Sequence, residues 1–153
     1  MIDEPRILQT AAQPTAVIHL KIPREQIQDV MGPGYAELLS TLRDQFVFPS
    51  GPWFTHHFKI DPDTFDFEIG VPVSKTFTPE GRVQPSQLPA GRIARTVYRG
   101  PYDGLSDAWG EFDAWLKKNG HKPAADLWEV YLANPESHPD SSDWRTELNR
   151  PLR

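Results

Sequence analysis

Alternating apolar and polar residues predict strands at the start of the chain. Apolar side chains recur at every second position between Thr15 and Ile22, which is the period of a half-buried strand, and a strand over Arg6 to Gln13 precedes this one. Farther on, apolar residues recur at helical spacing until Gly32-Pro33-Gly34 interrupts them. The pattern predicts a short helical turn and then a second helix over Pro33 to Gln45.

Two more strands and a loop are predicted in the middle of the chain. Trp53 to Ile60 is rich in aromatic residues, and Thr64 to Val73 alternates in polarity, with the turn residues Asp61-Pro62-Asp63 between them. Residues 74–90 contain three prolines and few large apolar side chains. We therefore predict a connecting loop over 74–90, between a first half of about 1–73 and a second half of about 91–153.

The second half begins with a predicted strand over Gly91 to Arg99. A helix is predicted next, with Asp103 as its N-cap and Asn119-Gly120 as its stop signal. Strands over Leu127 to Ala133 and Asp143 to Asn149 complete the chain. The buried stripe expected for the helix has the spacing of one helical face: Leu105, Ala108, Trp109, Phe112 and Leu116.

The order strand, helix, strand, strand occurs in both halves. Phe67-Glu68 and Thr146-Glu147 lie 79 positions apart, and Pro72 and Pro151 show the same spacing. Phe54 to Phe58 aligns with Trp128 to Leu132 at a spacing of 74 positions, which equates Thr55 with Glu129 and His57 with Tyr131. The sequence therefore predicts a duplicated βαββ unit.

Composition narrows the classes of protein. The formal net charge of −5 disfavours a nucleic-acid binder, and the absence of cysteine excludes disulfides and thiolate metal sites. No metal-ligand spacing, phosphate-binding loop or serine-nucleophile motif is present, so we expect neither a metal nor a cofactor. The acidic start MIDEPRILQT has no apolar core, and no apolar run reaches the length of a membrane span. We expect a soluble, cytoplasmic protein.

Several short motifs follow one another in a fixed order. In the second half these are Arg99-Gly100-Pro101-Tyr102-Asp103-Gly104-Leu105, then Trp109, Trp115 and Asn119-Gly120, then Trp128-Glu129-Val130-Tyr131-Leu132, and finally Thr146-Glu147 with Arg150-Pro151-Leu152. Gly51-Pro52 and Glu68 to Val73 fit in the first half. In this order and spacing, the chain resembles a stand-alone member of the GyrI-like effector-binding domain family over nearly its whole length.

The resemblance implies a fold and a function. The fold is α+β: one domain over 1–153, built from two tandem pseudo-twofold βαββ units whose antiparallel strands form a ligand cleft, with helices on the outer face. The function is multidrug-type binding or sequestration of a lipophilic aromatic, possibly cationic, small molecule, as in domains attached to transcription regulators. If the protein takes part in regulation, we expect it to do so without a DNA-binding domain of its own.

Two alternative functions stay open. Related proteins hydrolyse reactive cyclopropane-type molecules in the same cleft, and others inhibit DNA gyrase, which would make a protein the partner. We expect binding rather than catalysis. If the protein is a hydrolase, Glu129, Tyr131 and Glu147 are the candidate catalytic residues.

Strand alternation singles out Glu129 as the principal candidate. It places Leu127, Glu129 and Tyr131 on one face, and the apolar residues Trp128, Val130 and Leu132 on the other. We expect the apolar set to pack under a helix and Glu129 to face the ligand. A carboxylate withdrawn from water among aromatic rings favours an organic cation, which the rings also attract.

Four further residues are candidates around Glu129. Trp53 and His57 are expected as ring walls for a planar ligand, and Tyr131 as a neighbour of the acid. Glu147 is a candidate second acid, because its strand is expected to pair with the strand of Glu129, and Glu68 is its counterpart in the first half. Trp109, in the helical stripe, is expected to be a core residue.

Overall fold

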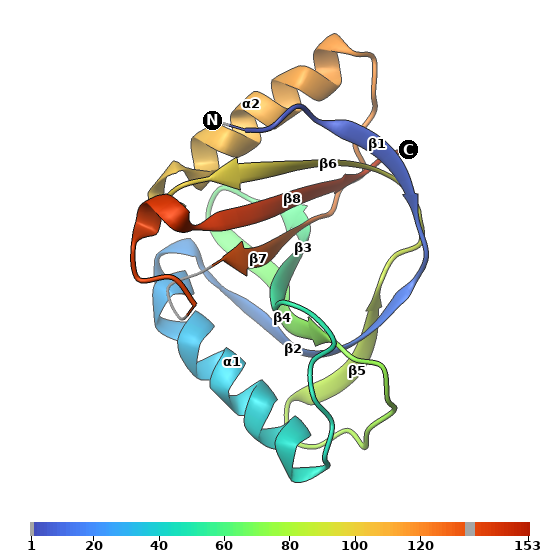
Figure 1. Cartoon of the computed structure of the whole chain (residues 1–153), viewed down its shortest axis with the longest axis vertical. Coiled ribbons are helices and arrows are strands. Elements are labelled where there is room, and N and C mark those ends of the chain that lie inside the picture. The colour runs from blue at the N-terminus through green and yellow to red at the C-terminus, as the bar shows by residue number, and fades with distance from the viewer. Residues whose placement is uncertain (1, 134–136) are drawn as a thin grey trace. The chain divides into compact units, whose positions relative to one another are not determined.

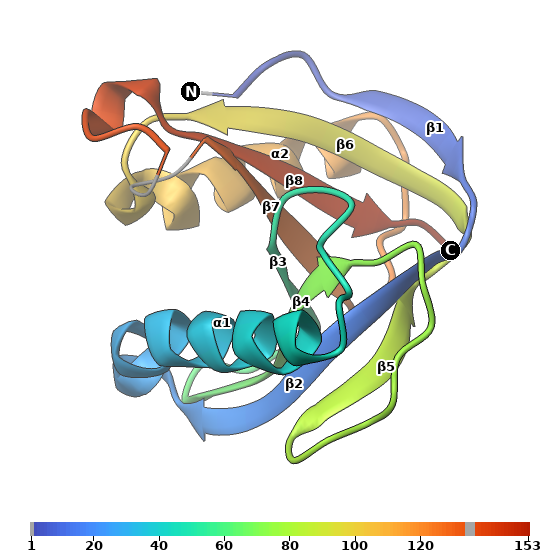
Figure 2. The same ribbon diagram turned by 60° about the horizontal axis from the view of Figure 1, so that its bottom comes forward.

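Antiparallel strands and two helices make up the protein in a computed structural model that describes residues 2–133 and 137–153. Three short 3₁₀ helices (η) accompany the longer elements. Figures 1 and 2 show these elements, which are β1 (Arg6–Thr10), β2 (Gln13–Pro23), η1 (Arg24–Gln26), α1 (Ile27–Asp44), β3 (Phe54–Ile60), β4 (Thr64–Pro72), β5 (Val83–Leu88), β6 (Gly91–Arg99), η2 (Tyr102–Gly104), α2 (Leu105–Lys118), β7 (Leu127–Ala133), η3 (Ser141–Asp143) and β8 (Arg145–Pro151). The predicted α+β class with antiparallel strands is confirmed.

The chain divides into two compact units. Unit 1 combines residues 1–10 with 91–153, and unit 2 comprises residues 11–90. The strand order is β1-β6-β8-β7 in unit 1 and β3-β4-β2-β5 in unit 2, and every pairing within a unit is antiparallel. The βαββ repeat is therefore present in both, as β2-α1-β3-β4 and as β6-α2-β7-β8.

Each unit also contains one strand from outside its own repeat. Strand β1 precedes the first repeat in the chain but pairs with β6 of the second, and β5 precedes the second repeat but pairs with β2 of the first. This β5 lies inside the segment 74–90, so a connecting loop over that whole segment is wrong. Pro85 does not prevent the pairing, because β5 has a partner on only one side and an edge strand tolerates a missing donor.

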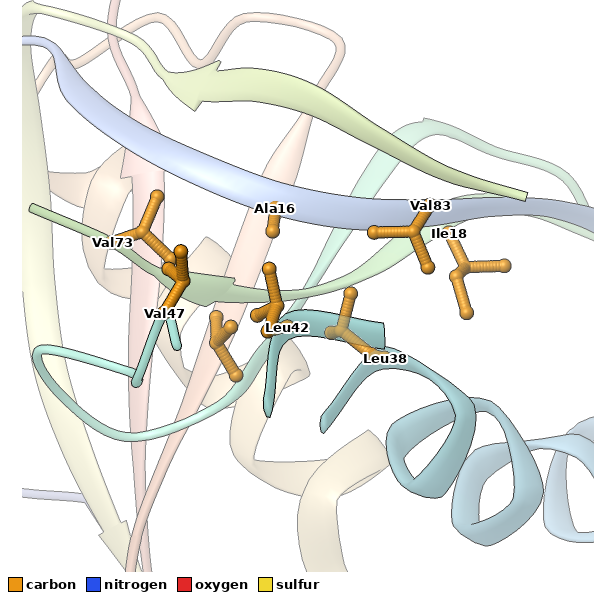
Figure 3. Close-up of a cluster of buried hydrophobic side chains, with 8 residues drawn as sticks. Ala16, Ile18, Leu38, Leu42, Val47, Val73 and Val83 are labelled. Atoms are coloured by element: carbon orange, nitrogen blue, oxygen red, sulfur yellow. The ribbon is translucent and has the colours of Figure 1, made fainter. Parts of the chain in front are cut away.

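The core of unit 2 lies between α1 and its sheet. Helix α1 buries Gly34, Leu38 and Leu42 at intervals of four residues. Figure 3 shows the last two among the apolar side chains that strands β2, β4 and β5 contribute. The predicted helix break at Pro33 is wrong, because Pro33 lies inside one continuous helix. Burial of the apolar stripe offsets the backbone hydrogen bond that proline cannot make.

The core of unit 1 repeats this arrangement. Helix α2 buries Ala108, Phe112 and Leu116 against β6 and β8, where Ala94, Tyr98 and Leu148 complete the cluster. Asn119-Gly120 ends the helix as predicted. Asp103 is not its N-cap, because η2 precedes α2 and no side chain caps the helix. The Tyr98 hydroxyl group shapes this turn, since it donates to the Pro101 carbonyl (2.8 Å) and lies where a Cβ on Gly104 would be.

Candidate functional site

Helix α2 and strand β7 bring Glu129 to the buried face of unit 1. In the β7–β8 register Glu129 lies opposite Leu148, whose side chain is in the core beneath α2. Directly opposed residues share a face of the sheet, so Glu129 faces the helix. The predicted alternation is confirmed, but the expectation that the Trp128 face packs under a helix is wrong, because Glu129 and Tyr131 occupy that position.

Two neutral donors hold the Glu129 carboxylate. Trp109 Nε1 on α2 donates to Oε2 at 2.7 Å, and the Tyr131 hydroxyl group donates to Oε1 at 2.8 Å. Trp109 also packs against the apolar core, so the expected core role describes only part of what it does. An indole N–H on the helical stripe, three positions before Phe112 and facing a predicted acid, was the signal that could have identified it as a site residue.

Desolvation dominates the electrostatics of Glu129. Burial raises the pKa of its carboxyl group, while the hydrogen bonds from Trp109 and Tyr131 act in the opposite direction. The side chain nevertheless keeps partial contact with solvent. Within the part of the chain that the structure describes, no Lys, Arg or His forms an ion pair with this carboxylate. Among residues 2–133 and 137–153, Glu129 thus has hydrogen-bond donors but no positively charged partner.

A row of aromatic rings extends from the neighbourhood of Glu129 to Trp144, the residue that follows η3. Tyr131 meets the edge of Tyr102, with ring centroids 5.8 Å apart, and Tyr102 lies 4.8 Å from Trp144 at a tilt of 35°. On the helix, Trp109 lies 5.7 Å from Phe112. Rings on both sides of the acid provide the surface that a lipophilic aromatic ligand or an organic cation prefers.

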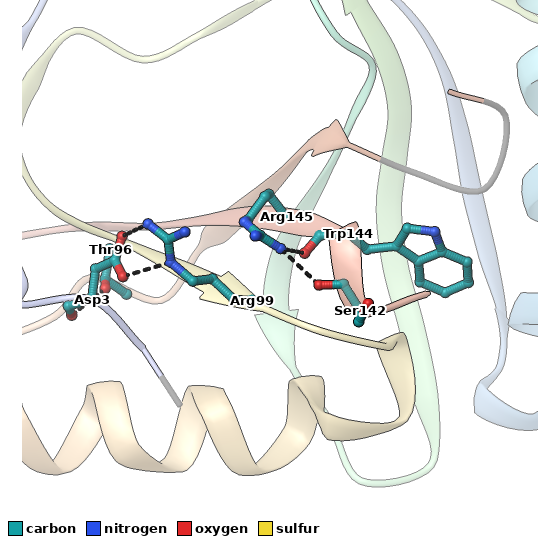
Figure 4. A network of polar contacts seen from close by, with 6 residues as sticks. All are labelled: Asp3, Thr96, Arg99, Ser142, Trp144 and Arg145. Carbon is teal, nitrogen blue, oxygen red and sulfur yellow. Dashed lines mark hydrogen bonds and ion pairs between the residues drawn. The ribbon is translucent and has the colours of Figure 1, made fainter. Parts of the chain in front are cut away.

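Backbone contacts fix the position of Trp144. Its carbonyl group accepts hydrogen bonds from Arg145 Nη1 (2.8 Å) and from the Gly100 amide (3.1 Å), and its indole donates to the His138 carbonyl (2.7 Å). Arg145 Nη1 also donates to the Ser142 carbonyl group of η3, at 3.1 Å (Figure 4). The same figure shows the ion pair of Arg99 with Asp3, which fastens the chain ahead of β1 to β6. The Trp144 ring is therefore held in place before any ligand arrives.

Glu147 does not join Glu129. Its strand pairs with that of Glu129 as predicted, but Glu147 lies opposite Val130, on the other face of the sheet. There it forms an ion pair with Arg95 (3.2 Å) and accepts a hydrogen bond from Asn149 (3.1 Å). This partner satisfies its charge, so the two acids do not form a pair.

Trp53 and His57 belong to unit 2. Trp53 stacks on Tyr35 of α1 with centroids 4.6 Å apart, and His57 stacks on Phe67 at 5.1 Å. Burial, followed by smaller electrostatic contributions from the neighbouring His56 and Arg24, lowers the pKa of His57 to about 4, so the His57 imidazole is neutral at pH 7. Both residues contact aromatic neighbours of their own unit.

The register confirms the internal alignment of the two units. Thr55 lies opposite Ile69 as Glu129 lies opposite Leu148, and His57 corresponds to Tyr131 in the same way. The strand register also shifts after His57 in unit 2 and after Tyr131 in unit 1. Glu68, the counterpart of Glu147, accepts from Ser86 (3.3 Å), and burial raises the pKa of its carboxyl group.

Residues 2–133 and 137–153 contain neither a metal-ligand cluster nor a helix able to cross a membrane. No group of three or more His, Asp or Glu side chains in these ranges is arranged to hold a metal ion. Neither α1 nor α2 has the length and apolarity that crossing a bilayer requires.

The model of one known family matches almost the whole chain. The model of the GyrI-like small molecule binding domain aligns with residues 3–153. The chain belongs to this family. The predicted GyrI-like membership is thereby confirmed, and small-molecule binding is the function that the family description assigns.

Solved structures share the GyrI-like fold at low sequence identity. The C-terminal domain of EcmrR superposes with a TM-score of 0.86 at 19% identity, covering 98% of this chain and 97% of that one. SAV2435 bound to tetraphenylphosphonium gives 0.74 at 13% identity, covering 99% and 94%. A hydrolase from Listeria innocua gives 0.65 at 13% identity, covering 97% and 91%.

Two further comparisons limit what is carried over to this GyrI-like chain. It spans 57% of the EcmrR chain in the complex of that protein with DNA, so it corresponds to part of that protein. None of the curated proteins matches its sequence.

Proposed function

We propose that this GyrI-like domain binds a lipophilic aromatic organic cation, and that the Glu129 carboxylate is its charge partner. One observation carries the proposal: Glu129 is withdrawn from water, receives two neutral hydrogen bonds and has no cationic partner among the described residues. An uncompensated carboxylate in such surroundings gains strongly from a cation that reaches it.

The rings around Glu129 support an aromatic ligand. Tyr131 and Trp109 both contact the acid, so a cation at the carboxylate also meets ring faces or edges. A cation–π contact contributes about 0.5–2 kcal/mol, depending on how far it is desolvated. SAV2435 has been solved with tetraphenylphosphonium, which has this combination of aromatic surface and positive charge. A lipophilic cation of this type is therefore the first ligand to test.

Trp53 and His57 stay predicted ligand-binding residues of unit 2. The neutral state of His57 supports this role, because an uncharged imidazole does not repel a cation. Trp53→Ala and His57→Ala should each weaken binding of a planar aromatic ligand, because each removes ring surface from unit 2. Titration calorimetry on the two variants measures this, and unchanged affinity in both would show that neither residue binds the ligand.

The decisive experiment compares a charged and an uncharged ligand. Tetraphenylphosphonium is titrated into the wild-type protein and into Glu129→Gln, with triphenylphosphine oxide as the neutral analogue. Loss of the charge contact should weaken binding of the cation by tenfold or more, which corresponds to about 1.4 kcal/mol. Binding of the neutral compound should change little. Equal losses for both compounds would assign Glu129 a structural role.

Glu147 provides a matched control for this experiment. It is a second carboxylate on the neighbouring strand, but it lies on the opposite face and is paired with Arg95. Glu147→Gln should change the affinity for tetraphenylphosphonium by no more than about twofold. This is well below the change of about 1.4 kcal/mol that a tenfold loss of affinity represents. A large loss would show that net charge, rather than the position of Glu129, governs binding.

Hydrolysis at the same residue is a second candidate function. The raised pKa of Glu129 suits a general base, and the Tyr131 hydroxyl group is already bonded to the carboxylate, where it can assist proton transfer. A hydrolase should consume an electrophilic cyclopropane and release the ring-opened product, detectable by mass spectrometry. Glu129→Gln should then abolish turnover while leaving binding of a neutral substrate intact.

A further inference from the structure

Helices α1 and α2 end in the same backbone motif. After α2, the amides of Gly120 and His121 donate back to Lys117 and Leu116, and Gly120 takes a left-handed φ of 74°. After α1, the amides of Phe46 and Val47 donate back to Arg43 and Leu42, and Phe46 has a φ of 58°. This hydrogen-bond pattern is the Schellman motif, whose left-handed position normally holds glycine.

Phe46 is therefore an unfavourable residue at this position of the fold. A side chain in the left-handed region crowds the following carbonyl group, which glycine avoids. Packing within the chain does not compensate, because Phe46 is 77% exposed and Phe48 is 63% exposed. Among the described residues, the only other exposed large apolar side chain is Leu132, at 44%. A strained and exposed aromatic residue indicates a contact outside the chain.

The backbone that carries Phe46 and Phe48 is held firmly. Val47, between them, is 4% exposed and lies beside Leu42 in the core of unit 2 (Figure 3). The Gln45 amide group both donates to and accepts from the backbone of Thr78, at 2.9 and 2.8 Å. The two rings thus project from an ordered frame, which lowers the entropic cost of a contact.

Charges next to the rings are self-complementary. Arg43 and Asp44 are adjacent and exposed, and within residues 2–133 and 137–153 neither side chain forms an ion pair. The patch is therefore apolar with one positive and one negative charge, and has no net charge. A twofold axis would place each Arg43 near the Asp44 of the other copy, because an isologous interface uses the same surface on both sides.

We infer that Phe46 and Phe48, with Arg43 and Asp44, form a surface on which a second copy of this chain docks. Two phenylalanine side chains bury on the order of 150–250 Å² each, below the roughly 800 Å² per partner of a standard interface. The association belongs to the weak, concentration-dependent class. It is independent of Glu129 and of ligand binding there.

Sedimentation velocity over a range of protein concentrations tests the surface. Wild-type protein should shift from monomer towards dimer as the concentration rises. The double variant Phe46→Gly, Phe48→Ser should weaken the association by at least tenfold. It should also unfold at the same temperature as wild type or at a higher one, because glycine relieves the left-handed strain, so a loss of dimer cannot come from misfolding.

Charge exchange tests the orientation of the two copies. Arg43→Glu and Asp44→Arg should each weaken self-association, since like charges then meet across the axis. An equimolar mixture of the two variants restores opposite charges at both contacts, and should dimerise more strongly than either variant alone. Leu132→Ser is the matched control, because it removes another exposed apolar side chain and should change nothing.

Three results would overturn the proposal. One is a wild-type protein that stays monomeric at all concentrations, and the second is a dimer that survives the double substitution. The third is a monomer that co-sediments with phosphatidylcholine vesicles through these rings, which would assign the surface to lipid instead. Titration of tetraphenylphosphonium into the double variant should give wild-type affinity, which separates the result from the proposed function.

Discussion

Unit 1 and unit 2 place different chemistry at the same position beneath their helices. In unit 1 this position holds Glu129, which receives hydrogen bonds from the helix and from its own strand. In unit 2 it holds Thr55, which is 1% exposed and lies opposite the buried Ile69. The strand register and its shift after the third residue of this segment are the same in both units. The two units therefore share a backbone arrangement, but at this position only unit 1 has a carboxylate.

The neighbours of this position differ in a matching way. Unit 1 surrounds its acid with donors, whereas unit 2 surrounds His57 with Phe65 and Phe67 and keeps its imidazole neutral. A buried charge therefore requires its own hydrogen-bond donors, and exchanging residues between the units should be costly where donors are lacking.

Thr55→Glu should have the largest effect. It transfers the acid of unit 1 to the equivalent position of unit 2, where Thr55 is 1% exposed and the surroundings are arranged for a hydroxyl group rather than a carboxylate. A buried charge without donors arranged for it costs about 3–5 kcal/mol, so the midpoint of urea unfolding should fall sharply at pH 7. Thr55→Val is the control and should cost about 1 kcal/mol. Equal stability of the two variants would show that unit 2 accommodates a carboxylate.

Acid should destabilise unit 2 through His57. Its pKa falls from 6.5 to about 4 on folding, so the folded state resists protonation. Stability from this group is complete above pH 6.5 and is lost as the pH falls towards 4, by roughly 3 kcal/mol at 1.36 kcal/mol per unit. His57→Gln should flatten this part of the stability profile, measured by urea unfolding from pH 7 to pH 4. A profile that keeps its slope would assign the loss to other groups.

Glu129 should give the opposite pH dependence in unit 1. Its pKa is raised on folding, so its contribution is complete below the ordinary value of 4.5 and is lost as the pH rises above that value. Glu129→Gln should therefore gain stability relative to wild type between pH 4 and pH 7. The hydrogen bonds from Trp109 and Tyr131, which stabilise the ionised form, limit this gain. A gain that is independent of pH would contradict this origin.

Gly34→Ala should reveal a difference in how closely α1 and α2 pack on their sheets. The equivalent position of α2 is Ala108, but a Cβ on Gly34 would lie 2.7 Å from Cδ1 of Ile69. Overpacking of this kind costs about 1–3 kcal/mol, reduced here by the higher helix propensity of alanine. Thermal unfolding measures the change, with Gly110→Ala as the control, since nothing lies near its Cβ position. Stabilisation in both variants would show that Ile69 moves freely.

The helix ends should give the smallest effects, of opposite sign. Gly120→Ala places a side chain in the left-handed region and should cost about 1–2 kcal/mol. Phe46→Gly removes such a side chain and should stabilise by about 0.5–1 kcal/mol, after the larger entropy of unfolded glycine is included. Differential scanning calorimetry detects both shifts, and destabilisation by Phe46→Gly would mean that the ring packs within the chain.

Much of the frame could be predicted from sequence because its signals are local. The strands predicted over Gly91 to Arg99 and Leu127 to Ala133 coincide with β6 and β7, and the spacing of Phe67-Glu68 and Thr146-Glu147 identified the repeat that the registers confirm. Strand β5 was missed, because its pairing with β2 depends on tertiary contact rather than on its own proline-containing sequence. The helix break predicted at Pro33 was wrong for a related reason, because packing of α1 outweighs the local cost of proline.

The site was predicted less completely than the fold. Alternation separated Glu129 from Trp128 correctly, but apolarity alone suggested the wrong face for the helix. The deciding interaction is the bond from Trp109, 20 positions earlier in the chain, and no periodicity encodes such a partner. The same is true of Glu147, whose neighbour Arg95 could be found only through the pairing of β6 with β8.

The pairing of β1 with β6 also has a consequence for biosynthesis. Thr10 and its partner Gly91 are 81 positions apart, so β1 leaves the ribosome long before the strand it pairs with. Unit 2 is contiguous in the chain and can close while synthesis continues, whereas unit 1 must wait for residues 91–153. Joining the present ends and reopening the chain just after Thr10 would make both units contiguous. Such a circular permutant should refold faster, since its slowest loop closure has been shortened.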